Sequence, residues 1–536
     1  MAPRKLLPVT VLSGFLGAGK TTLLKKILMQ DNTKEEDKLK MAVLVNDMGE
    51  INIDADEIKN TKLIQEEAQM VELHNGCICC TLRGDLLKQV KALSEETTFD
   101  YLVIESTGIS EPLPVAQTFT MNVDGATVVP SGGHQSHDHD HAHAPSEVQS
   151  LMNFAQLDTM ATVVDALNIF DVLGSISTLA EKNMTGMVGN TGVKDDEKPA
   201  AANEVVDDRS LAQLMLDQIE FANVIVVSKA PLLKEKPGVI EEITSLLQRL
   251  NPSAKIVVPQ ELHYADLEIS SVIGTKLFDM EKAQKSAGWI AELQKQMTGE
   301  GHTPETEEYG VGSVLFRNRT RPFHPARLRE ILAGFGNYAT SIALGSRDDK
   351  QDEGELKDEA ARGPEDANVH ALCGPFDGVV RAKGRLWIAS ACSYPINLQI
   401  AGRHLGLTPT QPFLYAVMES EWPGEDWNDF EHFEEMTSQG IWFKDSGYGD
   451  SMSEAVFIGV KLDKPRITKA LENALLTDEE LAGGKTEWKK FEDVFFGGRF
   501  FNVMPDEPSV KMLKQFVRRK PGKSGKNGKN GKSSKA

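Results

Sequence analysis

A glycine-rich segment near the amino terminus constrains the fold of this chain more than any other feature. It runs from Gly14 to Thr22 and has the spacing G-x-x-x-x-G-K-T. The apolar run 6–12 precedes it at the length of a buried strand, and a helical pattern, 22–29, follows it. This motif binds phosphate when it connects a strand to a helix in this order. The sequence therefore predicts a phosphate-binding loop, because a chance glycine-rich turn would lack these flanking elements.

The residue types of this loop suit a nucleoside triphosphate with Mg²⁺. Glycines let backbone N–H groups turn inward around a phosphate, and the following helix directs the positive end of its dipole at the same anion. Lys20 is predicted to bridge the β- and γ-phosphates, and Thr21 to offer its hydroxyl to Mg²⁺. The predicted nucleotide contacts in this loop are Gly14, Gly17, Ala18, Gly19, Lys20, Thr21 and Thr22.

Apolar runs of strand length alternate with helical patterns through the first half of the chain. The runs lie at 6–12, 41–46, 101–105, 160–164, 223–227 and 256–259, and the helical patterns at 20–30, 85–94 and 211–221. This alternation predicts an α/β P-loop domain with a mostly parallel sheet over residues 1–275. Two inserts in it, 122–150 and 185–209, contain few apolar residues and are expected to be disordered.

A second, smaller α+β domain is predicted at 312–504, after a helix, 279–297, and a linker within residues 276–311. Its expected strands lie at 312–317, 378–381, 386–390 and 455–461, and its expected helices at 325–333 and 464–475. An acidic insert, 346–367, and a low-complexity basic tail, 505–536, are expected to be disordered.

Charge and cysteine content narrow the class of protein. The net charge of −21 argues against nucleic-acid binding except through the basic tail, for which a nuclear address and a solubilising role are alternatives. The sequence shows no secretory pattern and no apolar run of membrane-spanning length. Three of the five cysteines fall within four positions, which is unlike a disulfide framework and indicates a reduced, cytoplasmic protein with a thiolate site.

Two acidic residues that follow predicted strands are candidate partners of Mg²⁺. Glu105 ends the run 101–105, where a P-loop protein places its second Mg²⁺-directed acid, and Glu105-x-x-Gly108 resembles a switch whose glycine N–H senses the γ-phosphate. Asp47 follows the run 41–46 in a polar loop, and such loops line the ligand crevice of parallel sheets. An ordinary strand-end acid for Glu105 and a capping acid for Asp47 are the alternatives.

The segment Gly76-Cys77-Ile78-Cys79-Cys80 is the second specific signal. Three thiolates in C-x-C-C spacing can converge on one soft or borderline ion such as Zn²⁺. They leave a fourth position open, which suits metal transfer or regulation better than a sealed structural site. Packing as small buried side chains and redox activity are the alternatives.

A histidine-rich stretch lies within the first insert, where five of the twelve histidines alternate with aspartates. Imidazoles on such a loop can collect Zn²⁺ and similar ions weakly and in a pH-dependent way, and a solvated spacer is the alternative. The candidate ligands are His134, His137, His139, His141 and His143.

Taken in order, these motifs resemble the CobW-like GTPases, which are metallochaperones related to the GTPases that mature urease and hydrogenase. The resemblance rests on the P-loop, N-D-x-G-E at 46–50, G-C-I-C-C at 76–80, E-S-T-G at 105–108, and C-terminal blocks at 321–328, 383–389 and 456–459. It implies GTP hydrolysis coupled to loading of zinc into a client metalloprotein, with the three clustered cysteines as metal ligands. Methionine aminopeptidase is the client that similar eukaryotic proteins supply, although no client-reading motif is visible in this sequence.

One departure from this family concerns the nucleotide base. The family's Asn-Lys-x-Asp is replaced here by Ser228-Lys229-Ala230-Pro231. Ser228 and Lys229 are still predicted to bind the nucleotide, but the carboxylate that selects guanine is missing at this place. Loss of one buried hydrogen-bond partner lowers discrimination against ATP by about tenfold, so GTP remains the expected ligand with reduced selectivity.

The sequence thus predicts a GTPase with GTP, Mg²⁺ and Zn²⁺ as ligands and with metal affinity coupled to the nucleotide state. The predicted catalytic residues are Lys20, Thr21, Asp47 and Glu105, and hydrolysis is expected to be slow without a partner, because no arginine finger is evident. Zinc storage through the histidine-rich loop and a nucleotide-dependent assembly factor without a metal role are the rival functions. The sequence leaves the oligomeric state open.

Overall fold

The structure, a computed structural model, describes two sheets and the helices around them. The described residues are 6–30, 38–46, 68–73, 90–94, 99–106, 108, 110–120, 151, 154–175, 210–236, 238–291, 293, 310–335, 338–339, 374–423, 433–438, 440–443 and 447–503. Among these residues, no helix is both long and apolar enough to cross a membrane.

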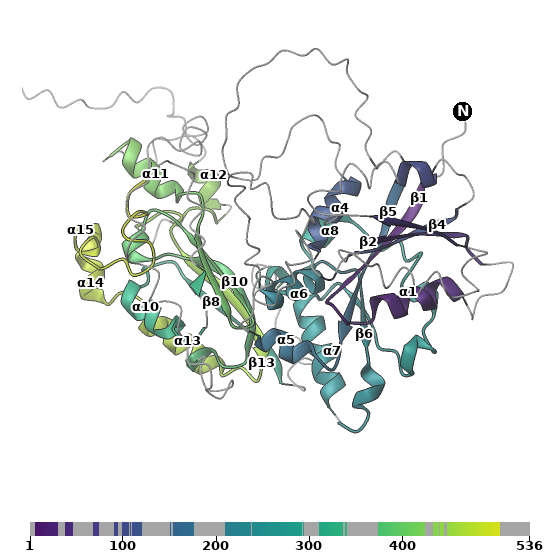
Figure 1. Ribbon diagram of the computed structural model, residues 1–536. Helices are drawn as coiled ribbons and strands as arrows, with labels where there is room; N and C mark the ends of the chain where they lie inside the picture. The colour runs from purple at the N-terminus through teal and green to yellow at the C-terminus, as the bar shows by residue number, and fades with distance from the viewer. Residues whose placement is uncertain are drawn as a thin grey trace, which may run out of the picture.

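The first sheet has seven parallel strands in the order β3-β2-β4-β1-β5-β6-β7 (Figure 1). Its strands are β1 (Leu7–Gly14), β2 (Met41–Asn46), β3 (Ala68–Leu73), β4 (Tyr101–Glu105), β5 (Ala155–Asp165), β6 (Val224–Ser228) and β7 (Lys255–Val257). Its helices are α1 (Lys20–Met29), α4 (Pro112–Thr120), α5 (Ile169–Gly174), α6 (Leu211–Glu220), α7 (Val239–Leu250) and α8 (Met280–Gln284). Short 3₁₀ turns are η4 (Ala230–Leu233), η5 (Leu262–Tyr264) and η6 (Ile269–Ser271). The predicted α/β fold with a parallel sheet is therefore confirmed.

Alternate residues of the central strands pack into two different apolar clusters, one for each face of this sheet. Leu102 and Ile104 of β4 belong to one cluster, whereas Tyr101 and Val103 belong to the other. Side chains of a strand alternate between the two faces, so both faces of β4 are covered and the strand is buried throughout. This explains why the strand appears in the sequence as an unbroken apolar run.

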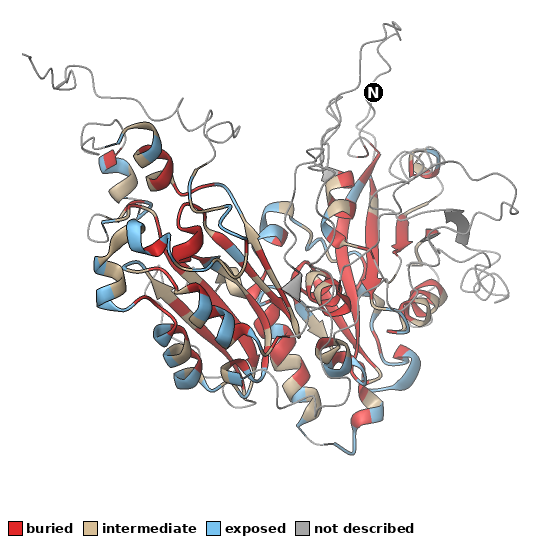
Figure 2. Cartoon of the chain, turned by 60° about the vertical axis from the view of Figure 1, so that its left-hand side comes forward, coloured by how far each residue is buried: buried red, intermediate tan, exposed pale blue. Residues whose placement is uncertain are grey.

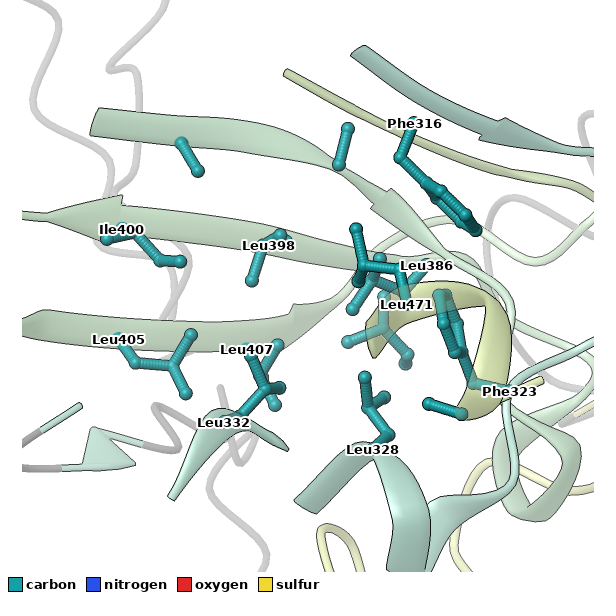
Figure 3. Packing of buried hydrophobic residues seen from close by; sticks show 14 of the residues in the cluster. Phe316, Phe323, Leu328, Leu332, Leu386, Leu398, Ile400, Leu405, Leu407 and Leu471 are labelled. Carbon is teal, nitrogen blue, oxygen red and sulfur yellow. The ribbon is translucent and has the colours of Figure 1, made fainter. Parts of the chain in front are cut away.

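The second sheet is largely antiparallel and has the strand order β8-β13-β10-β11-β12-β9. Its strands are β8 (Val311–Asn318), β9 (Tyr338–Ala339), β10 (Val379–Leu386), β11 (Ile396–Ala401), β12 (His404–Pro409) and β13 (Ser453–Val460). The accompanying helices are α10 (Pro325–Leu332), α11 (Leu414–Glu421), α12 (Phe433–Ser438), α13 (Lys464–Asn473), α14 (Asp478–Ala482) and α15 (Gly484–Trp488), with 3₁₀ turns η8 (Gly374–Phe376) and η9 (Ala389–Ala391). Leu328 of α10 and Leu471 of α13 pack with Leu398 and Leu407 of the sheet into one apolar core (Figure 3). This is the predicted α+β arrangement, whereas the predicted domain limits stay predictions.

Two local predictions were wrong, and one hairpin was missed. The runs 378–381 and 386–390 are not two strands, because β10 continues through Gly384 with β11 paired on one side and β13 on the other. Residues 396–401 and 404–409 form a hairpin that was not predicted. The helix expected at 279–297 is interrupted, since Ser286 donates its hydroxyl to the backbone oxygens of Ala283 and Glu220 and thereby ends α8.

The two sheets share buried contacts through α5, α6 and α7. A single apolar cluster contains Leu173 of α5 and Ile219 of α6 together with Ala401, Val456 and Ile458 of the second sheet. Figure 2 shows buried residues continuing from one sheet to the other across these helices. The helices that cover the first sheet are therefore also the surface on which the second sheet is built.

Candidate functional site

The predicted phosphate-binding loop begins where β1 ends, at the carboxyl edge of the parallel sheet. Gly14 has a φ of +136°, and a Cβ atom placed on it would lie 2.4 Å from the carbonyl oxygen of Val163 in β5. Only glycine fits this position, because both the backbone conformation and the neighbouring strand exclude a side chain. The loop closes through a hydrogen bond from Ala18 N to Phe15 O, 3.1 Å, and α1 then begins at Lys20.

The ammonium group of Lys20 lies inside this loop. Its Nζ donates to the carbonyl oxygens of Gly14, at 2.9 Å, and Phe15, at 3.3 Å, and the side chain is buried. The lysine charge and the amino end of α1 therefore act on the same small region, which gives it a positive potential suited to phosphate. Gly17 and Gly19 have φ values of +73° and +100°, and Thr22 lies in the first turn of α1.

Thr21 and Glu105 come together although 84 residues separate them in sequence. The Thr21 hydroxyl donates to Oε1 of Glu105 over 3.1 Å, and Glu105 is buried at the end of β4. Pairing of Leu12 with Glu105 brings the end of β4 level with the start of the loop. A hydroxyl and a carboxylate are hard oxygen ligands, so these two residues fit Mg²⁺ in chemical type.

Gly108 lies directly against the phosphate-binding loop. A Cβ atom on Gly108 would be 2.9 Å from the backbone nitrogen of Leu16. Its neighbour Ser106 is tied to the same region, because both its backbone N–H and its hydroxyl donate to Leu12 O at 2.9 Å. The residue predicted to sense a γ-phosphate is therefore in contact with the loop predicted to bind it.

Ser228 and Lys229 attach the end of β6 to the same loop. The Ser228 hydroxyl donates to Ala18 O at 2.6 Å, and Lys229 Nζ donates to Gly17 O at 3.0 Å. Lys229 also forms an ion pair of 2.7 Å with Asp165 at the end of β5. Pro231, where the family pattern has its guanine-reading aspartate, lies in the first turn of η4 and has no hydrogen-bonding side chain.

Two further residues at this site were not predicted from the sequence. The Tyr264 hydroxyl donates to Gly19 O at 3.1 Å, and burial raises the pKa of this tyrosine so that it stays protonated. Asp165 holds Lys229 and also accepts from the backbone N–H of Leu167 at 2.9 Å. Asp165 could have been noticed as an acid at the end of an apolar run. Nothing local in the sequence marks Tyr264.

A cavity of about 590 Å³ adjoins the phosphate-binding loop on the side of α5 and α6. Phe15 and Leu16 of the loop line it together with Asp165, Phe170 and Gln218. The loop residue Leu16 is well exposed, so the mouth of this cavity has an apolar edge beside the predicted phosphate contacts.

The predicted metal site lies outside the described residues. This is true of Asp47, of the three cysteines Cys77, Cys79 and Cys80, and of the five histidines between 134 and 143. Over the ranges that the structure does describe, no group of three or more His, Cys, Asp or Glu side chains could hold a metal ion. The metal-ligand assignments therefore stay predictions.

A phosphate-binding loop on a parallel sheet, with a lysine in the loop and a threonine hydroxyl next to a strand-end carboxylate, defines a P-loop nucleoside triphosphatase domain. Family models match the chain at two places. Residues 8–258 match "CobW/HypB/UreG, nucleotide-binding domain", and residues 365–475 match "Cobalamin synthesis protein cobW C-terminal domain". The chain belongs to the CobW/HypB/UreG family of GTPases.

Two relatives known by sequence agree with this assignment. "Zinc-regulated GTPase metalloprotein activator 1" of Dictyostelium discoideum is 35% identical over 91% of this chain and 83% of its own length. The protein of the same name from Saccharomyces cerevisiae is 23% identical over 66% of this chain and 68% of its own length. Among solved structures, a Zn(II)-bound YjiA GTPase from E. coli is 18% identical and covers 88% of this chain and 99% of its own, with a TM-score of 0.30.

Proposed function

We propose that this GTPase is a zinc metallochaperone, which binds Zn²⁺ through Cys77, Cys79 and Cys80 and transfers it to a client metalloprotein. Relatives named zinc-regulated activators and zinc chaperones support the zinc role. The contacts among the phosphate-binding loop, Gly108 and β6 support a nucleotide-controlled mechanism. In this proposal zinc is the ion that is transferred, and GTP hydrolysis with Mg²⁺ controls its transfer.

The observation that carries the coupling of zinc to nucleotide is the register of β3. Leu73, the last residue of β3, pairs with Asn46 of β2, and Val45 of β2 pairs with Glu105 of β4. The chain therefore leaves β3 at the same edge of the sheet as the phosphate-binding loop, three strand positions away. At about 4.8 Å per strand this is about 14 Å. Cys77 follows only four residues after Leu73, a separation that the chain can span.

The described residues supply the nucleotide half of this mechanism. Lys20 would neutralise the β- and γ-phosphates, and Gly108 would present its N–H to the γ-phosphate. Thr21 and Glu105, with Asp47 as a further candidate, would hold Mg²⁺, whose charge stabilises the leaving phosphate oxygens. Hydrolysis would release Gly108 from the γ-phosphate and change the geometry of neighbouring loops at this edge of the sheet.

Zinc affinity in the two nucleotide states tests this function. Zn²⁺ is titrated into the full chain with GDP and with a non-hydrolysable GTP analogue, and the two dissociation constants are expected to differ by at least fivefold, an ordinary coupling free energy. Equal constants would contradict the coupling. A variant with Cys77, Cys79 and Cys80 all changed to Ser should lose stoichiometric zinc, and retention would contradict the ligand assignment.

A matched control is Cys392→Ser. Cys392 is buried in the C-terminal half, where burial raises the pKa of its thiol to about 11, and among the described residues it belongs to no group of three or more His, Cys, Asp or Glu side chains that could hold a metal ion. This variant should keep full zinc stoichiometry. Deletion of residues 130–147 tests the rival function. Loss of all zinc binding in this variant would favour zinc storage by the histidine-rich loop over transfer through the cysteines.

Two finer assignments follow from the same proposal. Methionine aminopeptidase is the client to test first, by transfer of labelled zinc and recovery of peptidase activity. Competition between GTP and ATP tests the base site, where Lys229 is retained but Ser228 and Pro231 replace the family's asparagine and aspartate. The preference for GTP is expected to be at least about tenfold weaker than that of a relative with the aspartate, and an equal preference would mean that another carboxylate reads the base.

A further inference from the structure

Gln218 of α6 is fully buried and holds the Gly108 segment through its side-chain amide. Its Nε2 donates to the carbonyl oxygens of Gly108, at 3.3 Å, and Ser110, at 3.1 Å. The backbone oxygen of Gln218 accepts the Thr162 hydroxyl at 2.9 Å, and Thr162 contacts the Ser13 hydroxyl at 2.8 Å. Gln218 is thus tied both to the Gly108 segment and to the last residue of β1 before the loop.

Gly108 is therefore held both by the phosphate-binding loop and by Gln218. Its Cα lies against the backbone of Leu16, where a Cβ atom would come within 2.9 Å of a nitrogen, and its carbonyl is held by Gln218. Any displacement of Gly108 toward a γ-phosphate must lengthen or redirect the Gln218 hydrogen bonds, or else carry α6 with it.

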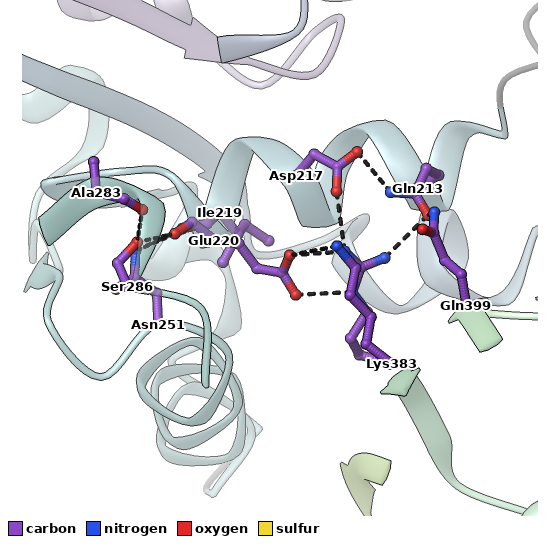
Figure 4. A network of polar contacts seen from close by, with 10 residues as sticks. Gln213, Asp217, Ile219, Glu220, Asn251, Ala283, Ser286, Lys383 and Gln399 are labelled. Carbon is purple, nitrogen blue, oxygen red and sulfur yellow. Dashed lines mark hydrogen bonds and ion pairs between the residues drawn. The ribbon is translucent and has the colours of Figure 1, made fainter. Parts of the chain in front are cut away.

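The same turn of α6 is fixed to the second sheet by Arg381 of β10. The guanidinium is completely buried, and its Nε and Nη2 donate to the two carboxylate oxygens of Glu220 at 2.8 and 2.7 Å. Nη2 also donates to Asp217 at 3.0 Å, and Nη1 donates to Gln213 at 3.0 Å. Figure 4 shows Gln213, Asp217 and Glu220 of α6 directed at the strands that carry Lys383 and Gln399.

The contact between Arg381 and α6 allows little change in geometry. A buried guanidinium is stable only when paired, and the fork of Arg381 uses both oxygens of one carboxylate and one oxygen of another. Burial alone would lower the pKa of Arg381, but Glu220 and Asp217 outweigh it and raise the pKa, so the charge is kept. Asp217 and Glu220 flank Gln218 in sequence, so α6 cannot rotate or slide without changing both contacts.

We propose that Gln218 is a positioning residue for the nucleotide-sensing segment and that α6, through Arg381, transmits the nucleotide state to the C-terminal sheet. This inference rests on the nucleotide site proposed above. The second sheet then takes part in GTP binding and hydrolysis, because β10 and β11 respond to the nucleotide bound at the phosphate-binding loop. A client or regulator that binds the C-terminal sheet would, by reciprocity, alter the affinity for GTP relative to GDP.

Hydrogen exchange and nucleotide affinity of the full chain test this proposal. Exchange is measured with GDP and with a non-hydrolysable GTP analogue, in peptides covering α6 and residues 379–401. The wild-type protein should show different protection of 379–401 in the two states. Gln218→Met, which keeps the size of the side chain and removes the amide, should abolish that difference. It should also raise the ratio of the GDP to the GTP-analogue dissociation constant by about fivefold, because Gly108 can then move toward a γ-phosphate without lengthening this hydrogen bond.

Three companion variants keep the test decisive. Gln218→Leu removes the same donor and replaces Gln218→Met should that variant fail to fold. Glu220→Gln keeps the packing but weakens the Arg381 contact, and should reduce the change in 379–401 while the affinity ratio stays within twofold of wild type. Arg317→Gln is the matched control, since Arg317 pairs with Glu454 within the second sheet at 2.5 Å, away from α6. This control should retain the wild-type exchange difference.

Either of two results would overturn the proposal: identical protection of 379–401 in both nucleotide states of the wild type, or an unchanged affinity ratio in folded Gln218 variants. A uniform loss of affinity for both nucleotides in those variants would indicate a merely structural role and would also overturn it. Failure of the wild-type protein to bind either nucleotide is a different outcome, because it refutes the nucleotide site itself.

Discussion

The Tyr264 hydroxyl provides a sharp test of how the phosphate-binding loop is held. It donates to Gly19 O at 3.1 Å, and the same oxygen accepts the Leu23 N–H of α1 at 3.0 Å. Tyr264→Phe therefore removes one neutral hydrogen bond without leaving Gly19 O unpaired, a loss of about 1 kcal/mol. If the bond fixes the loop in its binding form, this energy appears in the nucleotide dissociation constant as an increase of about fivefold.

Tyr101→Phe is the matched control. Tyr101 is also buried, and its hydroxyl contacts Asp158 Oδ2 at 2.7 Å, Gly274 N at 2.8 Å and Thr10 Oγ1 at 2.9 Å. Its removal leaves several buried polar groups with fewer partners, so we expect it to lower the free energy of unfolding by about 2–4 kcal/mol. None of these partners belongs to the phosphate-binding loop.

The two effects are separated by calorimetric titration with a GTP analogue and by urea denaturation of the same samples. Tyr101→Phe should be the less stable protein with nucleotide affinity within twofold of wild type, and Tyr264→Phe the more stable protein with the weaker affinity. The reasoning is refuted if affinity follows stability in both variants, because Tyr264 would then contribute only to folding.

Three further predictions concern single residues. Gly14→Ala should lower the free energy of unfolding by about 3–5 kcal/mol in urea denaturation, because its Cβ would meet Val163 O at 2.4 Å. A Cβ on Gly17 would have no atom within 4 Å, so Gly17→Ala should lower the free energy of unfolding by only about 1 kcal/mol. Equal losses in the two variants would contradict this geometry. Glu105→Gln should weaken Mg²⁺ binding to the nucleotide complex at least tenfold while Mg²⁺-free nucleotide affinity stays within threefold, and an unchanged Mg²⁺ titration would exclude this carboxylate. The hydrogen bonds from Arg327 lower the pKa of Glu480 to about 2, so the stabilisation is complete above the unfolded pKa of 4.5 and is lost as the pH falls toward 2. Glu480→Gln should therefore cost about 1–2 kcal/mol at pH 7, after allowance for solvent screening, and progressively less below pH 4.5 in denaturation series; a cost independent of pH would contradict this.

The parallel sheet could be predicted because its central strands are buried on both faces. Such strands form unbroken apolar runs, as at 41–46 and 101–105, and the phosphate-binding loop identifies the edge at which they end. The edge strand β3 was missed, since Ala68–Leu73 includes Gln69 and Glu72 and lacks a continuous apolar run. The hairpin of β11 and β12 was missed for a related reason: over residues 396–400 and 404–409, buried residues alternate with exposed or half-buried ones, so the apolar signal of the pair is diluted.

The candidate site could be predicted only where a local motif specifies the residue. The spacing of the loop indicated Lys20 and Thr21, and the end of an apolar run indicated Glu105. Tyr264 and Gln218 contact the same loop and its sensing segment across 245 and 110 residues of sequence. Their roles arise from tertiary packing of α6 and of the turn after β7, which no short window of sequence contains.

The apolar cluster that Leu173 and Ile219 share with Ala401, Val456 and Ile458 means that the two halves of this molecule have part of their interior in common, beside the clusters that each half forms alone. A protease nick between Leu293 and Gly310 would sever the backbone and leave this common interior, with the Arg381 fork, in place. The resulting fragments should co-elute on gel filtration and unfold in one thermal transition. An amino-terminal GTPase fragment expressed alone would expose its share of this cluster and should therefore aggregate.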